Sequence, residues 1–121
     1  MKLNIDKTQL ALNCIQGGIW SPQPVTEQPH LTLSSWHFFK LLDEALHLCG
    51  YCIENREGRI SSKVTAIDHK SRMCTTQSGR LYKLVGNAGN NSDADYVKGA
   101  WLRIANIARD DIENLYEVPT L

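Results

Sequence analysis

Two cysteines in a CxxC motif are the most obvious candidates for chemistry in this sequence. Cys49-Gly50-Tyr51-Cys52 has the spacing of a redox dithiol. A reactive dithiol places its first cysteine at a helix N-terminus, where the helix dipole stabilises the thiolate. The sequence instead places Cys49 at the C-terminal end of a predicted helix, where the dipole disfavours the thiolate. We therefore interpret the pair as two small buried residues rather than a catalytic site.

The same region offers ligands for a zinc ion. His47, Cys49 and Cys52 are three of the right type, and Cys74 or His69 supplies a fourth. Structural zinc sites usually combine two close-spaced pairs of ligands, and only one such pair occurs here. In addition, residues two apart on a helix point in different directions. Zinc binding through Cys49, Cys52 and Cys74 is therefore the second alternative function.

The sequence gives even less support for acid–base or nucleophilic catalysis than for a redox or zinc site. Glu44 and His47 have the ExxH spacing of metal-binding helical bundles, but a second ExxH pair is missing. No GxSxG, HExxH, P-loop or GxGxxG motif frames any histidine or serine. We predict a protein that is not an enzyme and needs no cofactor.

Charge is distributed unevenly, although its formal sum is zero. Residues 55–83 contain seven basic and two acidic residues, and both flanking segments are acidic. Such a basic region fits a polyanionic partner, or salt bridging within the chain and between copies. The first alternative function is therefore nucleic-acid binding, in which Tyr82 stacks on a base if it faces outward. The candidate residues are Arg56, Arg59, Lys63, Lys70, Arg72, Arg80, Tyr82 and Lys83.

The first half of the chain predicts two helices separated by an irregular arm. Asp6 caps a helix that runs to Gln16, and prolines then make the rest of residues 1–33 extended. A second helix is predicted over residues 34–50. Its apolar residues recur at helical spacing, and Gly50 ends it in a left-handed conformation. These apolar residues are Phe38, Leu41, Leu42, Ala45 and Cys49.

The second half predicts strands followed by a helix. Within residues 51–86, an antiparallel meander over residues 63–86 has strands at Val64–Asp68, Arg72–Thr76 and Arg80–Val85. Gly79 supplies the positive φ of its second turn. Ser92 and Asp95 form a capping box for a helix over residues 92–109, and residues 112–118 predict an edge strand.

Together these elements predict one α+β domain over residues 1–121. Its sheet has three to five mainly antiparallel strands, and two or three helices pack on one face. Without a signal peptide or a long apolar run, we expect a cytoplasmic protein that does not enter the membrane. Trp20 and Val25 of the arm and Leu115 of the edge strand favour self-association, so we predict a homodimer.

One segment carries a family resemblance. Residues 75–86 read Thr-Thr-Gln-Ser-Gly-Arg-Leu-Tyr-Lys-Leu-Val-Gly, followed by Asp93-Ala94-Asp95-Tyr96-Val97 and Trp101. With this T-x-SGR-x-Y-x-L hairpin, about a third of the chain resembles small uncharacterised bacterial proteins carried by mobile elements, such as phages or integron cassettes. The resemblance implies a small accessory protein that binds a partner, such as a host or defence component. We therefore predict a non-enzymatic interaction module.

Overall fold

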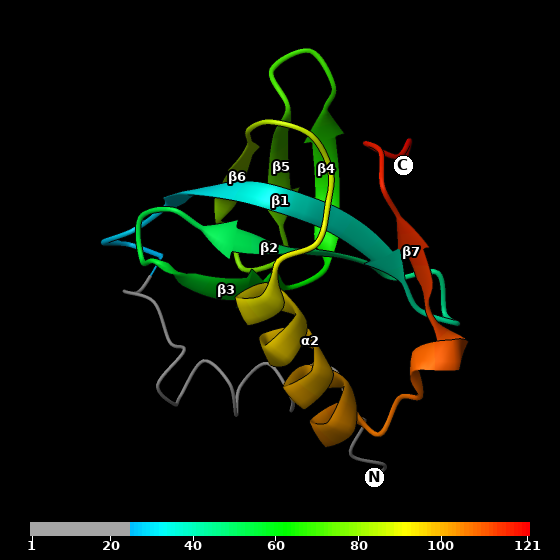
Figure 1. The fold of residues 1–121 in the computed structure, drawn as a ribbon. Coiled ribbons are helices and arrows are strands. Elements are labelled where there is room, and N and C mark those ends of the chain that lie inside the picture. The colour runs from blue at the N-terminus through cyan, green and yellow to red at the C-terminus, as the bar shows by residue number, and fades with distance from the viewer. Residues whose placement is uncertain (1–24) are drawn as a thin grey trace, which may run out of the picture.

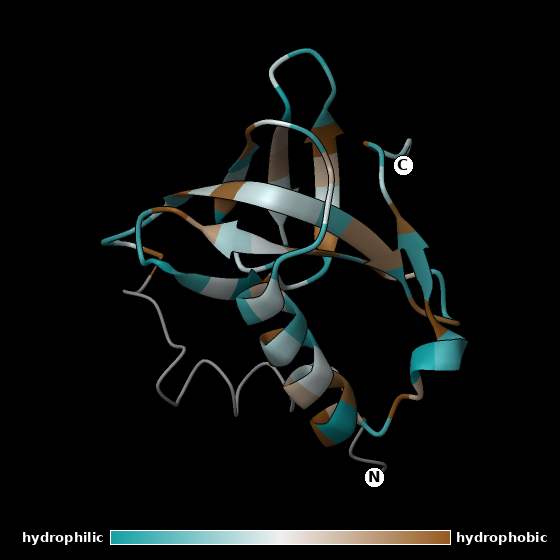
Figure 2. Cartoon of the chain, viewed as in Figure 1, coloured by the Kyte–Doolittle hydropathy of each residue, from teal (hydrophilic) through white to brown (hydrophobic). Residues whose placement is uncertain are grey.

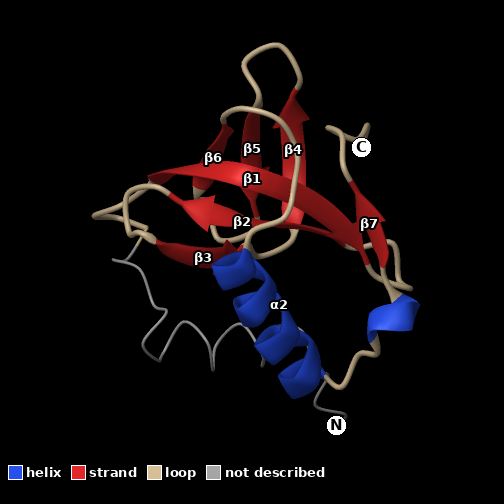
Figure 3. Ribbon diagram, in the orientation of Figure 1, coloured by secondary structure: helices blue, strands red, loops and turns tan. Residues whose placement is uncertain are grey.

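The computed structural model describes residues 25–121. The predicted first helix and Trp20 lie outside these residues. The described chain contains seven strands, one α-helix and one 3₁₀ turn (Figures 1 and 3). Their bounds are β1 (His30–Lys40), β2 (Leu46–Cys52), β3 (Glu57–Ile60), β4 (Val64–Asp68), β5 (Met73–Thr76), β6 (Leu81–Leu84), α2 (Ser92–Ala105), η1 (Arg109–Asp111) and β7 (Glu113–Leu115).

The strands form one strongly curved sheet in the order β3-β2-β1-β6-β5-β4. All pairings along this path are antiparallel except β1 with β6, and β7 pairs with the far end of β1. A flat six-stranded sheet would separate its outermost strands by about 24 Å. The chain between Ile60 of β3 and Val64 of β4 can span at most about 14 Å. The sheet must therefore curl, which brings the ends of β3 and β4 together.

Apolar residues fill the concave face of this sheet. Leu31 and Leu33 of β1 alternate with half-buried or exposed residues, as expected where one face of a strand is covered. In contrast, the turn between β4 and β5 is hydrophilic (Figure 2). We call the buried cluster the concave core; it consists of Leu31, Leu33, Trp36, Phe38, Leu46, Leu48, Cys52, Val64, Cys74, Tyr82 and Leu84.

Helix α2 covers the opposite face of β2 and β3 (Figure 1). This packing creates a second cluster, the helix-side core, which consists of Phe39, Leu41, Cys49, Ile60, Ala94, Val97, Trp101, Leu102 and Ala105. Because both faces of β1 are covered here, residues 36–39 are buried without alternation. This part of β1 therefore separates two cores.

Two glycines allow close backbone contacts in this layer. Gly58 of β3 lies directly under the first turn of α2, where an added Cβ would be 2.3 Å from the carbonyl carbon of Asp93. Gly50 of β2 faces an irregularity in β1, where Ser35 has a φ of 47° and an added Cβ would be 3.1 Å from Trp36 Cα. Side chains at these positions would force the backbone apart.

The prediction of a helix over residues 34–50 is wrong. These residues form most of β1, a turn and most of β2. Leu41 and Ala45 close the turn through an N–H···O bond of 2.9 Å, and Glu44 adopts a positive φ of 71°. Asp43 Oδ1 also accepts a hydrogen bond from the Ala45 N–H at 3.0 Å. Gly50 lies inside β2 rather than at a helix end.

Other predicted elements are confirmed. The meander strands agree with β4, β5 and β6 within about one residue, and Gly79 has a φ of 89°. Helix α2 begins at Ser92 as predicted, although its N-cap is Asn91, and it ends at Ala105 rather than residue 109. The edge strand is the shorter β7. The mixed α and β class is confirmed, with more strands and fewer helices in residues 25–121 than predicted.

No helix in residues 25–121 is long and apolar enough to cross a membrane.

Candidate functional site

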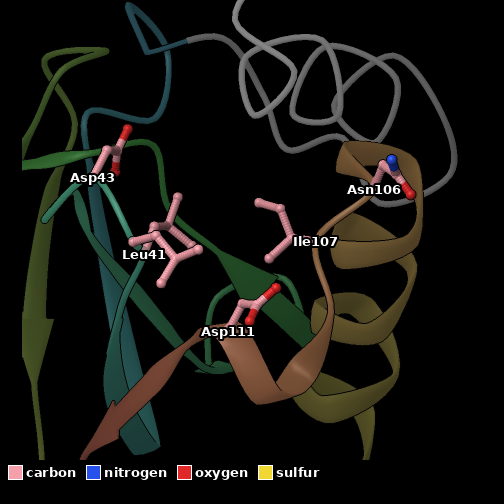
Figure 4. Close-up of a pocket in the computed structure, with 6 residues that line it drawn as sticks. Leu41, Asp43, Asn106, Ile107 and Asp111 are labelled. Atoms are coloured by element: carbon pink, nitrogen blue, oxygen red, sulfur yellow. The ribbon is translucent and has the colours of Figure 1, made fainter.

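A pocket of about 250 Å³ lies at the turn between β1 and β2 (Figure 4). One wall comes from this turn, and the other comes from the chain that leaves α2 and enters η1. Two segments about sixty residues apart in sequence therefore build it together. The lining residues are Leu41, Leu42, Asp43, Asn106, Ile107 and Asp111.

Local hydrogen bonds position the wall that follows α2. Asn106 ends the helix in a left-handed conformation, and its N–H donates to the Arg103 carbonyl at 3.1 Å. The Ile107 N–H donates to the Leu102 carbonyl at 2.9 Å, a pairing typical of helix C-termini. These bonds turn the chain back across the end of the helix-side core.

The pocket combines apolar walls with an acidic rim. Leu41 and Ile107 face each other across the hollow, and Asp111 points between them from η1 (Figure 4). Leu42 is 79% exposed at the tip of the turn. Nothing in this lining is a histidine, cysteine, serine or lysine, so these residues offer binding surface and negative charge but no nucleophile.

Nearby cations leave the acidic rim unneutralised. Lys40 pairs with Glu44 at 3.4 Å, and Arg109 pairs with Asp95 at 3.3 Å. Among residues 25–121, the carboxylate of Asp111 has no hydrogen-bond or salt-bridge partner. The rim therefore presents anionic groups to whatever enters the pocket.

A second polar cluster lies between α2, β1 and β7, and its members Lys98 and His37 are buried. Lys98 Nζ donates to His37 Nε2 at 2.9 Å and to Asn114 Oδ1 at 2.5 Å, and it lies 4.8 Å from the centroid of the Phe39 ring. His37 Nδ1 lies 3.1 Å from the Gly89 carbonyl, so the hydrogen bonds assign the proton to Nδ1. Because Lys98 of α2 contacts His37 and Phe39 of β1 and Asn114 of β7, this cluster joins α2 to both strands.

The protonation of this second cluster is perturbed by its surroundings. Burial lowers the pKa of the Lys98 ammonium. Burial also lowers the pKa of His37, and the neighbouring Lys98 charge lowers it further. His37 is therefore held in its neutral form, in which Nε2 can accept from Lys98.

Three residues of the predicted nucleic-acid surface are buried. Tyr82 is 1% exposed and accepts a hydrogen bond from Arg59 Nε at 3.1 Å inside the curve of the sheet. The condition for base stacking by Tyr82 therefore fails. Arg80 is 3% exposed, and its Nε donates to the Gln28 carbonyl at 3.0 Å. The other five candidates are accessible to some extent: Arg56, Lys63, Lys70 and Lys83 are exposed, and Arg72 is half-buried.

Two of these accessible cations are held by backbone carbonyls. Arg72 Nη2 donates to Gly86 at 2.8 Å, and its guanidinium lies 5.3 Å from the Trp36 ring centroid. Lys83 Nζ donates to the Ser71 carbonyl at 2.6 Å. These hydrogen bonds fit a role for both cations in stabilising the ends of strands.

The predicted zinc ligands do not converge. Cys49 lies in the helix-side core, whereas Cys52 and Cys74 lie in the concave core on the other face of the sheet. In the described part of the chain, no three histidine, cysteine, aspartate or glutamate side chains gather around one point. Burial raises the pKa of Cys49 to about 12 and that of Cys74 to about 11.

Of the three residues proposed for self-association, the structure describes two. Trp20 lies outside the described residues, and Val25 is half-buried at their start. Leu115 pairs with Phe38 across β7 and β1 and packs against the concave core, so its main contact is within the chain. The exposed leucine that sequence reasoning missed is Leu42, because the predicted helix placed it on an apolar face.

Comparison with protein-family models, with curated proteins and with solved structures gives no match to this chain. Its function is therefore inferred from its own geometry.

Proposed function

We propose that this protein is a non-enzymatic interaction module that binds a partner protein at the pocket between the β1–β2 turn and η1. The proposal rests on the exposure of Leu42, which is 79% exposed although it lies beside an apolar hollow. A lone exposed leucine is ordinary on a protein surface. Beside a hollow with leucine and isoleucine walls, it extends one apolar surface that a partner can cover.

The resemblance to cargo proteins of mobile elements supports the same role. Such a protein acts as a small accessory factor in the cytoplasm, and a second copy of the chain is one partner to test. Nucleic-acid binding has less support, because Arg59, Arg80 and Tyr82 are buried. Zinc binding has less support because the cysteines lie on opposite faces of the sheet.

A paired substitution tests the proposal. The tagged full chain is used to capture proteins from a lysate of the organism that encodes it. Each captured protein is identified, purified and bound again to the chain, and light scattering measures self-association in parallel. Burying a leucine contributes about 1.5–3 kcal/mol, so we expect Leu42→Asp to weaken binding at least about tenfold.

The matched control is Ile53→Asp, which adds the same charge to an exposed apolar residue at the opposite end of the β1–β2 hairpin. This variant should change the dissociation constant by less than about twofold, since it lies outside the proposed contact. Both variants must retain the circular dichroism spectrum of the parent. Equal binding by the parent and Leu42→Asp would reject the proposal, for a partner protein and for a second copy alike.

A further inference from the structure

We infer that the partner inserts a lysine or arginine side chain into this pocket, with its aliphatic stem between Leu41 and Ile107 and its charged group at Asp111. This inference rests on the proposed function and specifies the chemistry that the partner must present. Its basis is the size of the pocket, the charge of the rim and the apolar walls.

The size of the pocket limits the occupant. Its volume of about 250 Å³ is below the range of roughly 300–1,000 Å³ that is typical of sites for small molecules and cofactors. Leu42, which lines the pocket, is largely exposed, so solvent reaches this wall. A single long side chain from a partner surface fits this space better than a nucleotide or a cofactor.

The charge of the rim determines the sign of the occupant. Asp43 lies on the other side of Leu41 from Asp111 (Figure 4), where its Oδ1 accepts from the Ala45 N–H at 3.0 Å and its charge adds to the negative potential of the rim. Asp111 has both oxygens without a partner in residues 25–121. No basic residue lines the pocket, and the nearest salt bridges occupy Lys40 and Arg109 with other carboxylates. The rim therefore repels an anion and attracts a cation.

The apolar walls distinguish a basic side chain from a bare metal ion. Calcium requires six to eight oxygen ligands, and magnesium requires octahedral oxygen coordination. The described chain gathers no three acidic, histidine or cysteine side chains at one point. Lysine and arginine, however, bury an aliphatic stem against apolar residues while the charged end stays near water. Leu41 and Ile107 supply the surface for that stem.

Titration with amino-acid derivatives tests the inference. The isotope-labelled full chain is titrated with the N-acetyl methylamides of lysine, arginine and norleucine, and amide chemical shifts are recorded. Norleucine has an aliphatic chain like that of lysine but carries no charge. We expect lysine or arginine to shift the amides of Asn106, Ile107 and Asp111, with dissociation constants in the millimolar range, and norleucine to bind at least about threefold more weakly.

Neighbouring acidic residues provide a matched pair of variants. Asp111→Asn removes a charge from the rim, and we expect it to weaken binding of the basic probes about two- to fivefold. Asp110→Asn removes the same charge one residue earlier, outside the lining, and we expect no more than a slight change. Binding should also weaken with added salt, because the attraction is between partly exposed charges.

The inference fails if norleucine binds as tightly as lysine and arginine. It also fails if Asp110→Asn and Asp111→Asn weaken binding equally, or if no probe shifts the pocket amides at about 50 mM, far above a millimolar dissociation constant. If any of these results is found but Leu42→Asp still weakens partner binding, the proposed function is retained and only the inference about a basic side chain is rejected. Conversely, basic probes that bind while Leu42→Asp retains its partner would reject the proposed function alone.

Discussion

The two cores on either side of β1 and β2 contain different kinds of buried cation. In the concave core, the guanidinium of Arg59 donates to the Tyr82 hydroxyl, and arginine stays charged at every pH at which proteins fold. Against the helix-side core, Lys98 and His37 form a pair in which either partner can change its protonation. One sheet can therefore hold, on one face, a buried cation whose charge does not depend on pH and, on the other face, a buried pair whose protonation does.

The largest effect should come from the backbone contact that holds α2 on the sheet. Gly58→Ala places a Cβ 2.3 Å from the Asp93 carbonyl carbon, so α2 must move away from the helix-side core. Overpacking of this kind costs about 3 kcal/mol, and we expect urea unfolding to show that loss. Gly89→Ala is the control, because its Cβ would meet only Ser35 Cα at 3.9 Å. Similar urea midpoints for the two variants would mean that the contact between Gly58 and α2 is not tight.

Tyr82→Phe should have the next largest effect. It leaves the buried Arg59 guanidinium without its hydroxyl acceptor, and a hydrogen bond to a charged group contributes about 1.5–3 kcal/mol. Since arginine does not titrate, the loss of unfolding free energy should be the same at pH 6 and pH 9. A loss that changes strongly between these two pH values would contradict the comparison between the cores.

Acidification should weaken the helix-side core. Burial and the Lys98 charge lower the pKa of His37 in the folded state below its ordinary value of 6.5. The unfolded chain therefore binds the proton first, and the contribution of His37 is complete above pH 6.5 and is lost as the pH falls through the lowered pKa. We expect a loss of the order of 1 kcal/mol in urea unfolding, which the variant His37→Gln should lack. If parent and variant lose stability in parallel, His37 is not the group responsible.

The smallest effect should come from a pair that belongs to neither core. Lys40 and Glu44 form a salt bridge of 3.4 Å at the turn, and the Glu44 side chain is 79% exposed. Exposed pairs contribute little, so Glu44→Gln should change the unfolding free energy by less than about 0.5 kcal/mol. A change above about 1 kcal/mol would show that the turn matters more than its exposure suggests.

The sequence predicted the meander because local chemistry determines it. Its strands contain β-branched and aromatic residues, and Gly79 marks a turn that requires a positive φ. The β1–β2 hairpin lacks such signals. Glu44, rather than glycine, adopts the positive φ of its turn, and residues 36–39 are buried on both faces, so the twofold alternation of a strand disappears. The remaining apolar spacing then resembled that of a helix.

The pocket could not be predicted for the same reason. Leu41 and Leu42 were assigned to the interior of a helix, although they occupy a turn. Asp111 falls between the helix predicted over residues 92–109 and the strand predicted over residues 112–118, where the sequence indicates no element. Only the left-handed Asn106 and the turn that follows bring Asp111 beside Leu41, and that pairing spans about seventy residues of sequence. A contact between distant segments leaves no periodic signal.

The short link between β3 and β4 has a consequence for the order of folding. The antiparallel pairs β1–β2 and β4–β5–β6 join neighbours in sequence, so each can form early and locally. The parallel pairing of His30 with Leu81 instead closes a loop of about fifty residues, which slows its formation. Because Ser61-Ser62-Lys63 links β3 to β4 at the opposite edge, we expect the docking of β6 on β1 to curl the sheet. We expect this docking to be the rate-limiting event in folding.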